Sequence, residues 1–113
     1  GCVFLVRNGV AITPPVTNDI LESITRETII QLLREAHSTT VHEREVDRTE
    51  FYIADEVFLC GTGLGVTPVG AVDRFSVGDG NAGPLTLAVG ETYLDIVTGR
   101  SASHAEWLDQ VYD

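Results

Sequence analysis

Residues 56–69, EVFLCGTGLGVTPV, decide the fold class of the chain. The first five of them read as a buried strand, and three glycines within residues 61–65 then predict a sharp turn. A dinucleotide-binding fold would need its third glycine at residue 66 and a helix after it. Here the third glycine is Gly65, and the β-branched, proline-containing residues 66–69 predict another strand. The turn therefore joins two strands, which argues against a doubly wound parallel sheet.

Upstream of this stretch, two short strands are predicted over residues 3–6 and 10–12. They flank Asn8-Gly9, and Asn-Gly between apolar runs is a strong β-hairpin signal. Pro14-Pro15 ends the second strand, because paired prolines cannot continue a hydrogen-bonded ladder.

Between the hairpin and the glycine turn, residues 23–37 predict a helix. Its apolar face contains Ile29, Leu33 and Ala36, with Ile30 beside them. The charged, β-branched residues that follow, 40–46, are typical of an edge strand. DRTE at residues 47–50 has the spacing of a capping box, which predicts a short helix through residue 54.

Downstream of the glycine turn, residues 66–76 predict further strand, interrupted at Pro68. A long helix is predicted over residues 83–98, because its Gly-Pro start places proline in the favoured first turn. A last helix contains the only tryptophan, Trp107. Strands and helices that do not alternate strictly indicate one α+β domain over residues 1–113, with mixed strands flanked by three to four helices.

The composition excludes several classes of function. A net charge of −10 repels a nucleic-acid backbone, and no basic stripe compensates for it. Arginine accounts for all seven of the Lys and Arg residues, so the chain has neither a Schiff-base lysine nor a P-loop lysine. No apolar run reaches the roughly 18 residues that a membrane-spanning helix needs. Methionine is absent, and we therefore expect the chain to be a segment of a longer product.

The two cysteines, Cys2 and Cys60, lie far apart in the sequence and form no CxxC pair. A disulfide framework or a zinc site would need more ligands than these. We expect buried or half-buried free thiols in a reducing cytoplasm, and no metal site.

LESITR at residues 21–26 is a candidate anion site. A helix that begins at Ser or Thr presents unpaired backbone N–H groups, hydroxyls and the positive end of its dipole, which together favour a phosphate. The same residue types are also ordinary helix N-caps, and both interpretations stay open. The glycine turn at 61–65 is similarly either a plain turn between strands or a place where backbone N–H groups meet a ligand.

Asp55 and Glu56 form an acidic pair directly before an apolar strand. Neighbours on a strand point to opposite faces of the sheet. We therefore expect one of the two to be solvated and the other to be hydrogen-bonded, without a general acid or base role.

Taken together, several segments resemble the branched-chain amino acid aminotransferases, which are class IV, fold type IV pyridoxal-phosphate enzymes. The resemblance extends over nearly all 113 residues. It implies the larger, C-terminal, pseudo-barrel-like domain of that fold. The segments that occur in the family's order and spacing are 4–9 (FLVRNG), 13–15 (TPP), 20–26 (ILESITR), 54–58 (ADEVF), 61–62 (GT), 67–69 (TPV) and 83–86 (GPLT).

The resemblance assigns cofactor contacts to four residues. The backbone N–H of Ile24 and the N–H and hydroxyl of Thr25 would bind the pyridoxal-phosphate phosphate. Thr62 would add a second hydroxyl, and the Leu21 side chain would pack on the pyridine ring. These contacts place the two N–H-rich turns in one site.

The same resemblance places the substrate beside the glycine turn. The N–H groups of Thr62 and Gly63 would hold the substrate α-carboxylate, and Leu64 would lie near the side-chain pocket. The sequence departs from the family at Glu22-Ser23, where the family usually has Pro-Gly. A carboxylate beside a phosphate is unfavourable unless it points to solvent.

The implied reaction moves an amino group between a branched-chain amino acid and 2-oxoglutarate. The family's catalytic lysine, its pyridine-nitrogen glutamate and a phosphate-binding arginine come from residues that would precede Gly1, so no catalytic residue is expected in this chain. We expect an amino acid and a keto acid as small-molecule partners, the missing N-terminal domain of the same protein, and a homodimer.

Two alternatives remain open from the sequence. The first is a D-amino-acid aminotransferase or an aminodeoxychorismate lyase on the same scaffold. The second is a degenerate, non-catalytic domain that binds a partner, which the absence of lysine and the Glu22-Ser23 departure favour.

Overall fold

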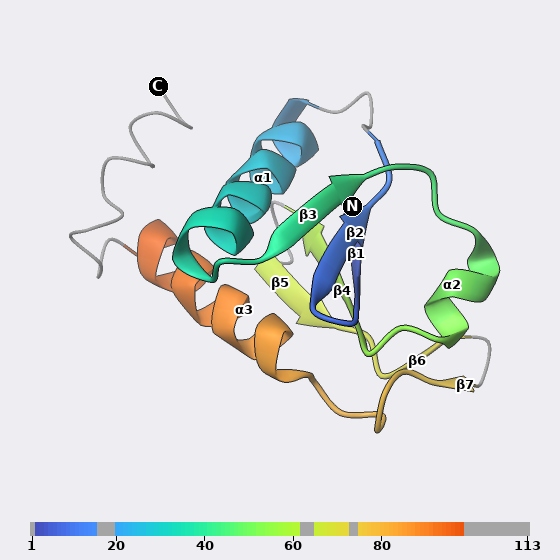
Figure 1. The fold of residues 1–113 in the computed structure, drawn as a ribbon. Coiled ribbons are helices and arrows are strands. Elements are labelled where there is room, and N and C mark those ends of the chain that lie inside the picture. The colour runs from blue at the N-terminus through green and yellow to red at the C-terminus, as the bar shows by residue number, and fades with distance from the viewer. Residues whose placement is uncertain (1, 16–19, 62–64, 73–74, 99–113) are drawn as a thin grey trace.

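The computed structural model describes residues 2–15, 20–61, 65–72 and 75–98 (Figure 1). Its strands and helices confirm the α+β class. In chain order they are β1 (Cys2–Arg7), β2 (Val10–Thr13), α1 (Ile20–Gln31, continued by a π-helical segment over Leu32–Ala36), β3 (Thr40–Glu43), α2 (Arg48–Tyr52), β4 (Glu56–Gly61), β5 (Gly65–Pro68), β6 (Ala71–Val72), β7 (Phe75–Ser76) and α3 (Pro84–Val97).

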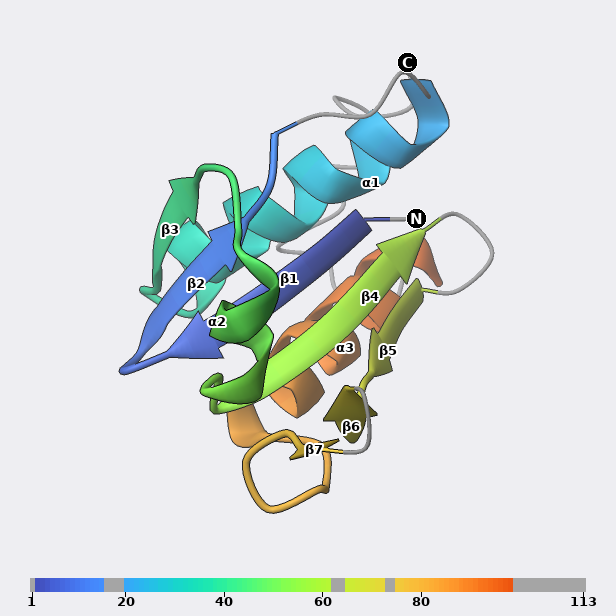
Figure 2. The same ribbon diagram turned by 90° about the vertical axis from the view of Figure 1, so that its right-hand side faces the viewer.

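The five longer strands form one mixed sheet in the order β3-β2-β1-β4-β5. β3 runs parallel to β2, while the other neighbouring strands are antiparallel. Helices α1 and α3 cover one face of the sheet, and α2 lies on the opposite face with the small β6–β7 hairpin beside it (Figures 1 and 2). In the described part of the chain, no helix is both long and apolar enough to cross a membrane.

The β1–β2 hairpin forms because its turn residues accept left-handed backbone angles. Asn8 has φ 52° and Gly9 has φ 76°, as a two-residue hairpin turn with positive φ at both central positions requires. The predicted hairpin is confirmed, and β2 ends at Thr13, directly before the paired prolines.

The main core lies between the sheet and the two long helices. Phe4 of β1 and Phe58 of β4 are fully buried there, with their rings stacked at 5.0 Å between centroids. Ile29, Ile30 and Leu33 of the first helix pack into the same core. The expected apolar face is therefore confirmed except at Ala36, which is exposed at the end of the π-helical segment.

Other predicted elements are confirmed with changed bounds. β3 is an edge strand, as expected, but it ends at Glu43. The strand expected over 66–76 is split into β5 and the β6–β7 hairpin, and β5 ends at Pro68. Gly83 caps α3, with Pro84 in its first turn. The expected last helix with Trp107 lies outside the described residues.

The predicted capping box is present at the start of α2. The Asp47 N–H donates to Glu50 Oε2 at 2.7 Å, and the Arg44 guanidinium donates to both carboxylate oxygens of Glu50 at 2.6 and 3.1 Å. The hydrogen bond from Arg44, followed by the one from the Asp47 N–H, lowers the pKa of Glu50 from an ordinary 4.5 to about 2. These bonds hold the exposed loop before α2 in place.

The lowered pKa of Glu50 predicts a pH-dependent stability. Because the folded-state pKa lies below the ordinary value, ionised Glu50 stabilises the fold above pH 4.5, and this contribution is lost as the pH falls from 4.5 toward about 2. Glu50→Gln should therefore flatten the fall in melting temperature across this window. Glu45→Gln, on an exposed neighbour, is the control. Equal pH profiles for wild type and Glu50→Gln would contradict the assignment.

Candidate functional site

The start of α1 and the strand ends that flank the glycine turn lie at one end of the molecule. β4 ends at Gly61 and β5 begins at Gly65, which pair with each other across the hairpin. The C-terminal end of β4 and the first turn of α1 point to this same end in both views (Figures 1 and 2). Gly65 has φ 61°, a left-handed angle that favours glycine at the close of this turn. Three predicted site residues, Thr62, Gly63 and Leu64, lie outside the described residues.

The start of α1 differs from the prediction. The helix begins at Ile20, so Ser23 is inside its first turn and does not cap it. The first four N–H groups of a helix have no partner within it, and here they belong to residues 20–23. Ile24 and Thr25 are the fifth and sixth residues, whose N–H groups are in position to bond to carbonyls four residues earlier. The Ser and Thr signal predicted the helix but placed its start three residues late.

The start of α1 still fits an anion. It offers N–H donors and the positive end of a helix dipole, and the hydroxyl-bearing Thr25 is 2% exposed one turn further on. Ile24 is half-buried beside it, and its carbonyl accepts the Thr28 hydroxyl at 2.9 Å. Leu21 is helical. The donor set has no general base, so it is suited to binding and orienting a phosphate.

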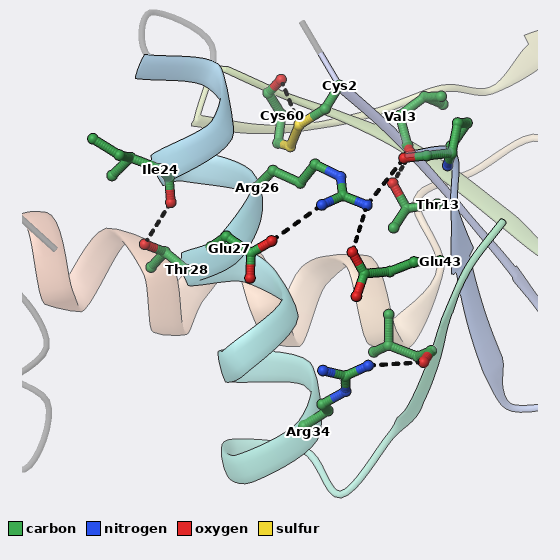
Figure 3. Close-up of polar contacts among 12 residues, drawn as sticks. Cys2, Val3, Thr13, Ile24, Arg26, Glu27, Thr28, Arg34, Glu43 and Cys60 are labelled. Carbon is green, nitrogen blue, oxygen red and sulfur yellow. Dashed lines mark hydrogen bonds and ion pairs between the residues drawn. A yellow bond between two sulfur atoms is a disulfide. The ribbon is translucent and has the colours of Figure 1, made fainter. Parts of the chain in front are cut away.

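A buried arginine follows Thr25 directly. The Arg26 side chain is 1% exposed, and its Nη1 donates to Glu27 Oε1 at 3.2 Å. Its Nη2 donates both to the Pro14 carbonyl at 3.0 Å and to Glu43 Oε1 at 2.9 Å (Figure 3). The Nε–H is buried and has no hydrogen-bond partner among the described residues. Arg26 thus ties the second turn of α1 to the residue after β2 and to the end of β3.

The burial of Arg26 was not predicted, although the spacing of the neighbouring residues indicates it. Arg26 precedes Ile29, Ile30 and Leu33 by three, four and seven residues, which is the spacing of one helix face. All three are fully buried, so the same periodicity that predicted the core also indicated burial of Arg26. An arginine stays charged in proteins, so its burial requires partners from neighbouring elements.

The two acidic residues at the start of β4 have the different environments that were predicted. Asp55 is exposed and accepts a hydrogen bond from the Asn8 N–H at 2.9 Å. Glu56 is buried, and it accepts hydrogen bonds from the Thr86 N–H at 2.7 Å, the Thr86 hydroxyl at 2.8 Å and the Leu85 N–H at 3.3 Å. Glu56 therefore binds N–H groups in the first turn of α3, whose N-cap residue is Gly83. A Cβ added at Gly83 would overlap the Glu56 carboxylate, which explains the glycine there.

The expectation of free thiols is wrong. Cys2 and Cys60 are direct partners in the β1–β4 register, with Cα atoms 5.2 Å apart, and their sulfurs form a disulfide (Figure 3). Antiparallel pairing brings together two residues that are 58 positions apart, which their spacing along the chain could not indicate. The argument for a cytoplasmic location loses its support from these thiols. The bridge lies one residue before the glycine turn.

Metal binding finds no support in the described part of the chain. No three side chains among its His, Cys, Asp and Glu residues are grouped so that they could hold a metal ion.

Comparison with known proteins identifies the class to which this α+β fold belongs. The model of the family described as amino-transferase class IV matches residues 2–72. The chain belongs to the class IV aminotransferase family.

Curated relatives indicate which aminotransferases within this family the chain is similar to. A probable branched-chain-amino-acid aminotransferase of Aquifex aeolicus is 44% identical over 111 residues, which are 98% of this chain and 36% of that protein. The branched-chain-amino-acid aminotransferase of Escherichia coli K12 is 41% identical over 109 residues, covering 96% of this chain and 35% of that protein. The chain thus spans about a third of the length of the curated relatives it matches.

A solved structure agrees with this grouping. The branched-chain amino acid aminotransferase of Thermobaculum terrenum, in its PLP form, superposes with a TM-score of 0.85 at 49% identity, covering 94% of this chain and 34% of that one. The fold type IV architecture is thereby confirmed.

Proposed function

We propose that the protein containing this chain transfers an amino group between a branched-chain amino acid and 2-oxoglutarate with pyridoxal phosphate as cofactor. The observation that supports this proposal is that the first turn of α1 and the C-terminal end of β4 point to one end of the sheet, in a chain of the class IV family (Figure 2). The cofactor, when bound, acts as the electron sink of the reaction. This chain contributes the groups that bind and orient it.

We assign the cofactor-binding role to Leu21, Ile24, Thr25 and Thr62. The assignment of the Ile24 and Thr25 N–H groups requires residues 20–22 to leave the helix when the phosphate binds, because α1 otherwise uses these donors itself. We propose that the Thr25 hydroxyl donates a further hydrogen bond to the phosphate. Since a phosphate is dianionic, each hydrogen bond to it is charge-assisted.

The substrate-binding role is assigned to Thr62, Gly63 and Leu64, in the turn after Gly61. Backbone N–H groups in a glycine-rich turn can converge on a carboxylate, because the absent side chains permit close approach. We propose that the two N–H groups hold the α-carboxylate and that Leu64 faces the side chain of the amino acid. The partners are therefore an amino acid, a keto acid and the remaining two thirds of the protein.

Thr25→Ala in the full-length protein should weaken pyridoxal-phosphate binding by about 10- to 100-fold, as expected for one charge-assisted hydrogen bond. Titration of the cofactor-free protein measures this. Thr28→Ala is a matched control, because Thr28 is equally buried one turn away and its hydroxyl donates to the Ile24 carbonyl. Equal affinities for the two variants would argue against the phosphate assignment.

The reaction itself is tested with a panel of keto acids. Full-length protein should convert 2-oxoisocaproate with glutamate as amino donor. Turnover of D-amino acids or of aminodeoxychorismate would support the same scaffold with a different substrate. No turnover, together with an open reading frame that encodes no lysine-bearing strand upstream of Gly1, would overturn the proposal in favour of a non-catalytic binding domain.

A further inference from the structure

We infer that Arg26 is a positioning residue for the cofactor phosphate, through its bonds to Pro14 and Glu43. The inference rests on the proposed function, since it concerns the same phosphate site. Arg26 directly follows Thr25 on α1, and its guanidinium lies between the helix and the strand edge in the close-up of Figure 3. Its Nη nitrogens are occupied by protein acceptors, so its effect on a ligand is exerted through Thr25.

The Nη2 nitrogen of Arg26 joins the helix to two strands. This one nitrogen donates to the Pro14 carbonyl at 3.0 Å and to Glu43 Oε1 at 2.9 Å. Pro14 follows β2 and Glu43 ends β3, so the bond pair connects α1 to two neighbouring strands at once. A planar guanidinium holds such partners in fixed directions. The second turn of α1 is therefore fixed relative to the sheet at the residue next to Thr25.

The rest of the helix is anchored differently. Its buried contacts further along are apolar, made by Ile29, Ile30, Leu32 and Leu33. Apolar packing is not directional and tolerates small shifts along the helix axis. One more arginine reaches β3, since Arg34 Nη2 donates to the Val41 carbonyl at 3.0 Å, but it lies more than two turns from Thr25. Directional control of the Thr25 end thus depends on Arg26.

The unpartnered Nε–H supports a functional reason for this arrangement. Buried polar groups in native proteins are nearly always hydrogen-bonded, so a donor left unpaired within the described structure, at 1% side-chain exposure, needs an explanation. Local rules of this kind are broken most often at functional sites. Replacing a buried ion pair by apolar side chains of similar volume is often neutral or stabilising, so stability alone does not account for an arginine at this position.

The test uses Glu43→Gln in the full-length protein, which leaves Arg26 in place and removes the charge that anchors it to β3. We expect pyridoxal-phosphate affinity to fall by about tenfold, as for other residues that orient a binding group. Affinity for pyridoxal, which has no phosphate, should stay unchanged. Glu27→Gln is the matched control, because Glu27 also pairs with Arg26 but lies on the same helix and cannot fix it to the sheet.

A second pair of variants guards against simple misfolding. Arg26→Met and Arg34→Met each remove one arginine that links the helix to the strand edge. Arg26, the near residue, is next to Thr25, whereas Arg34, the far residue, lies more than two turns from it. We expect the near variant to lose about tenfold or more in pyridoxal-phosphate affinity and the far variant to keep it, with circular dichroism confirming the fold. Glu43→Gln decides the question if Arg26→Met does not fold.

The results of these binding experiments distinguish a failure of the Arg26 inference from a failure of the proposed function. If Glu43→Gln and Glu27→Gln bind pyridoxal phosphate equally, or if pyridoxal and its phosphate weaken in parallel, the positioning role is overturned. If Thr25→Ala loses affinity and Glu43→Gln does not, the phosphate site stands without Arg26. If the full-length protein binds no pyridoxal phosphate at all, the proposed function fails as well.

Discussion

Reducing the Cys2–Cys60 disulfide is expected to lower the free energy of unfolding by about 4 kcal/mol, on the chain-entropy model for a loop closed across 58 residues. The cross-link restricts the unfolded chain, so its loss raises the entropy of unfolding. Reduction also releases the start of β1 from the end of β4, where the glycine turn begins. Both effects favour the unfolded state.

Urea unfolding of the chain with and without a reductant, followed by circular dichroism, measures this loss. The Cys2→Ala/Cys60→Ala double variant is the control, because reductant should not change its stability. A thiol titration gives an independent check. The denatured, unreduced chain should show no free thiol and the reduced chain two, and two thiols before reduction would contradict the bridge.

Glu56→Ala is expected to destabilise the fold by about 3 kcal/mol, because it removes three hydrogen bonds to a buried carboxylate and leaves their donors without an acceptor. The Thr86 hydroxyl and the first N–H groups of α3 lie in a buried position where water cannot fully replace the carboxylate. The favourable interaction of the carboxylate with the helix dipole is lost as well. Thermal or urea unfolding reports the change.

The neighbouring acidic residue, Asp55, provides the control variant for Glu56→Ala. Asp55→Ala removes one hydrogen bond at an exposed position, and should cost about 1 kcal/mol or less. Glu56→Gln should be intermediate, because one oxygen acceptor remains. Equal losses for Asp55→Ala and Glu56→Ala would show that burial of the Glu56 carboxylate does not govern the stability of α3.

The predicted elements that were correct depend on residues close together in the chain. Asn8-Gly9 requires only its own backbone angles to form a hairpin turn, and the 47–50 capping box closes over four residues. Gly83-Pro84 starts α3 in the same local way. Three-dimensional packing did not have to be known for any of these, because each signal operates within one turn.

Two errors concern the ends of the first helix. The α1 start was placed at Ser23 because a hydroxyl favours an N-cap, but a cap preference contributes only about 1 kcal/mol and can be overridden by the rest of the helix. Ala36 was expected in the core, but it is exposed where the π-helical segment ends. The π-helical segment over Leu32–Ala36 departs from the 3.6-residue period on which the Ala36 prediction was based.

The candidate site, too, could be predicted from the sequence only in part. The donor types and the two segments that carry them could be recognised from the sequence, and the split roles of Asp55 and Glu56 followed from strand alternation. Burial of Arg26 could be read from periodicity, but its partners Pro14 and Glu43 could not, because they come from two other parts of the chain. A sequence pattern gives the face on which a residue lies, whereas its partners depend on topology.

Local backbone preferences, readable in the amino acids alone, specify the hairpin, the buried strand before the glycine turn, the short capped helix and the start of α3. Three features instead required the folded chain: the bond between Cys2 and Cys60, the pairing of β3 with β2, and the link that Arg26 makes from the helix to two strands. These features depend on which strands become neighbours, and the packing of the whole core selects the neighbours in a sheet.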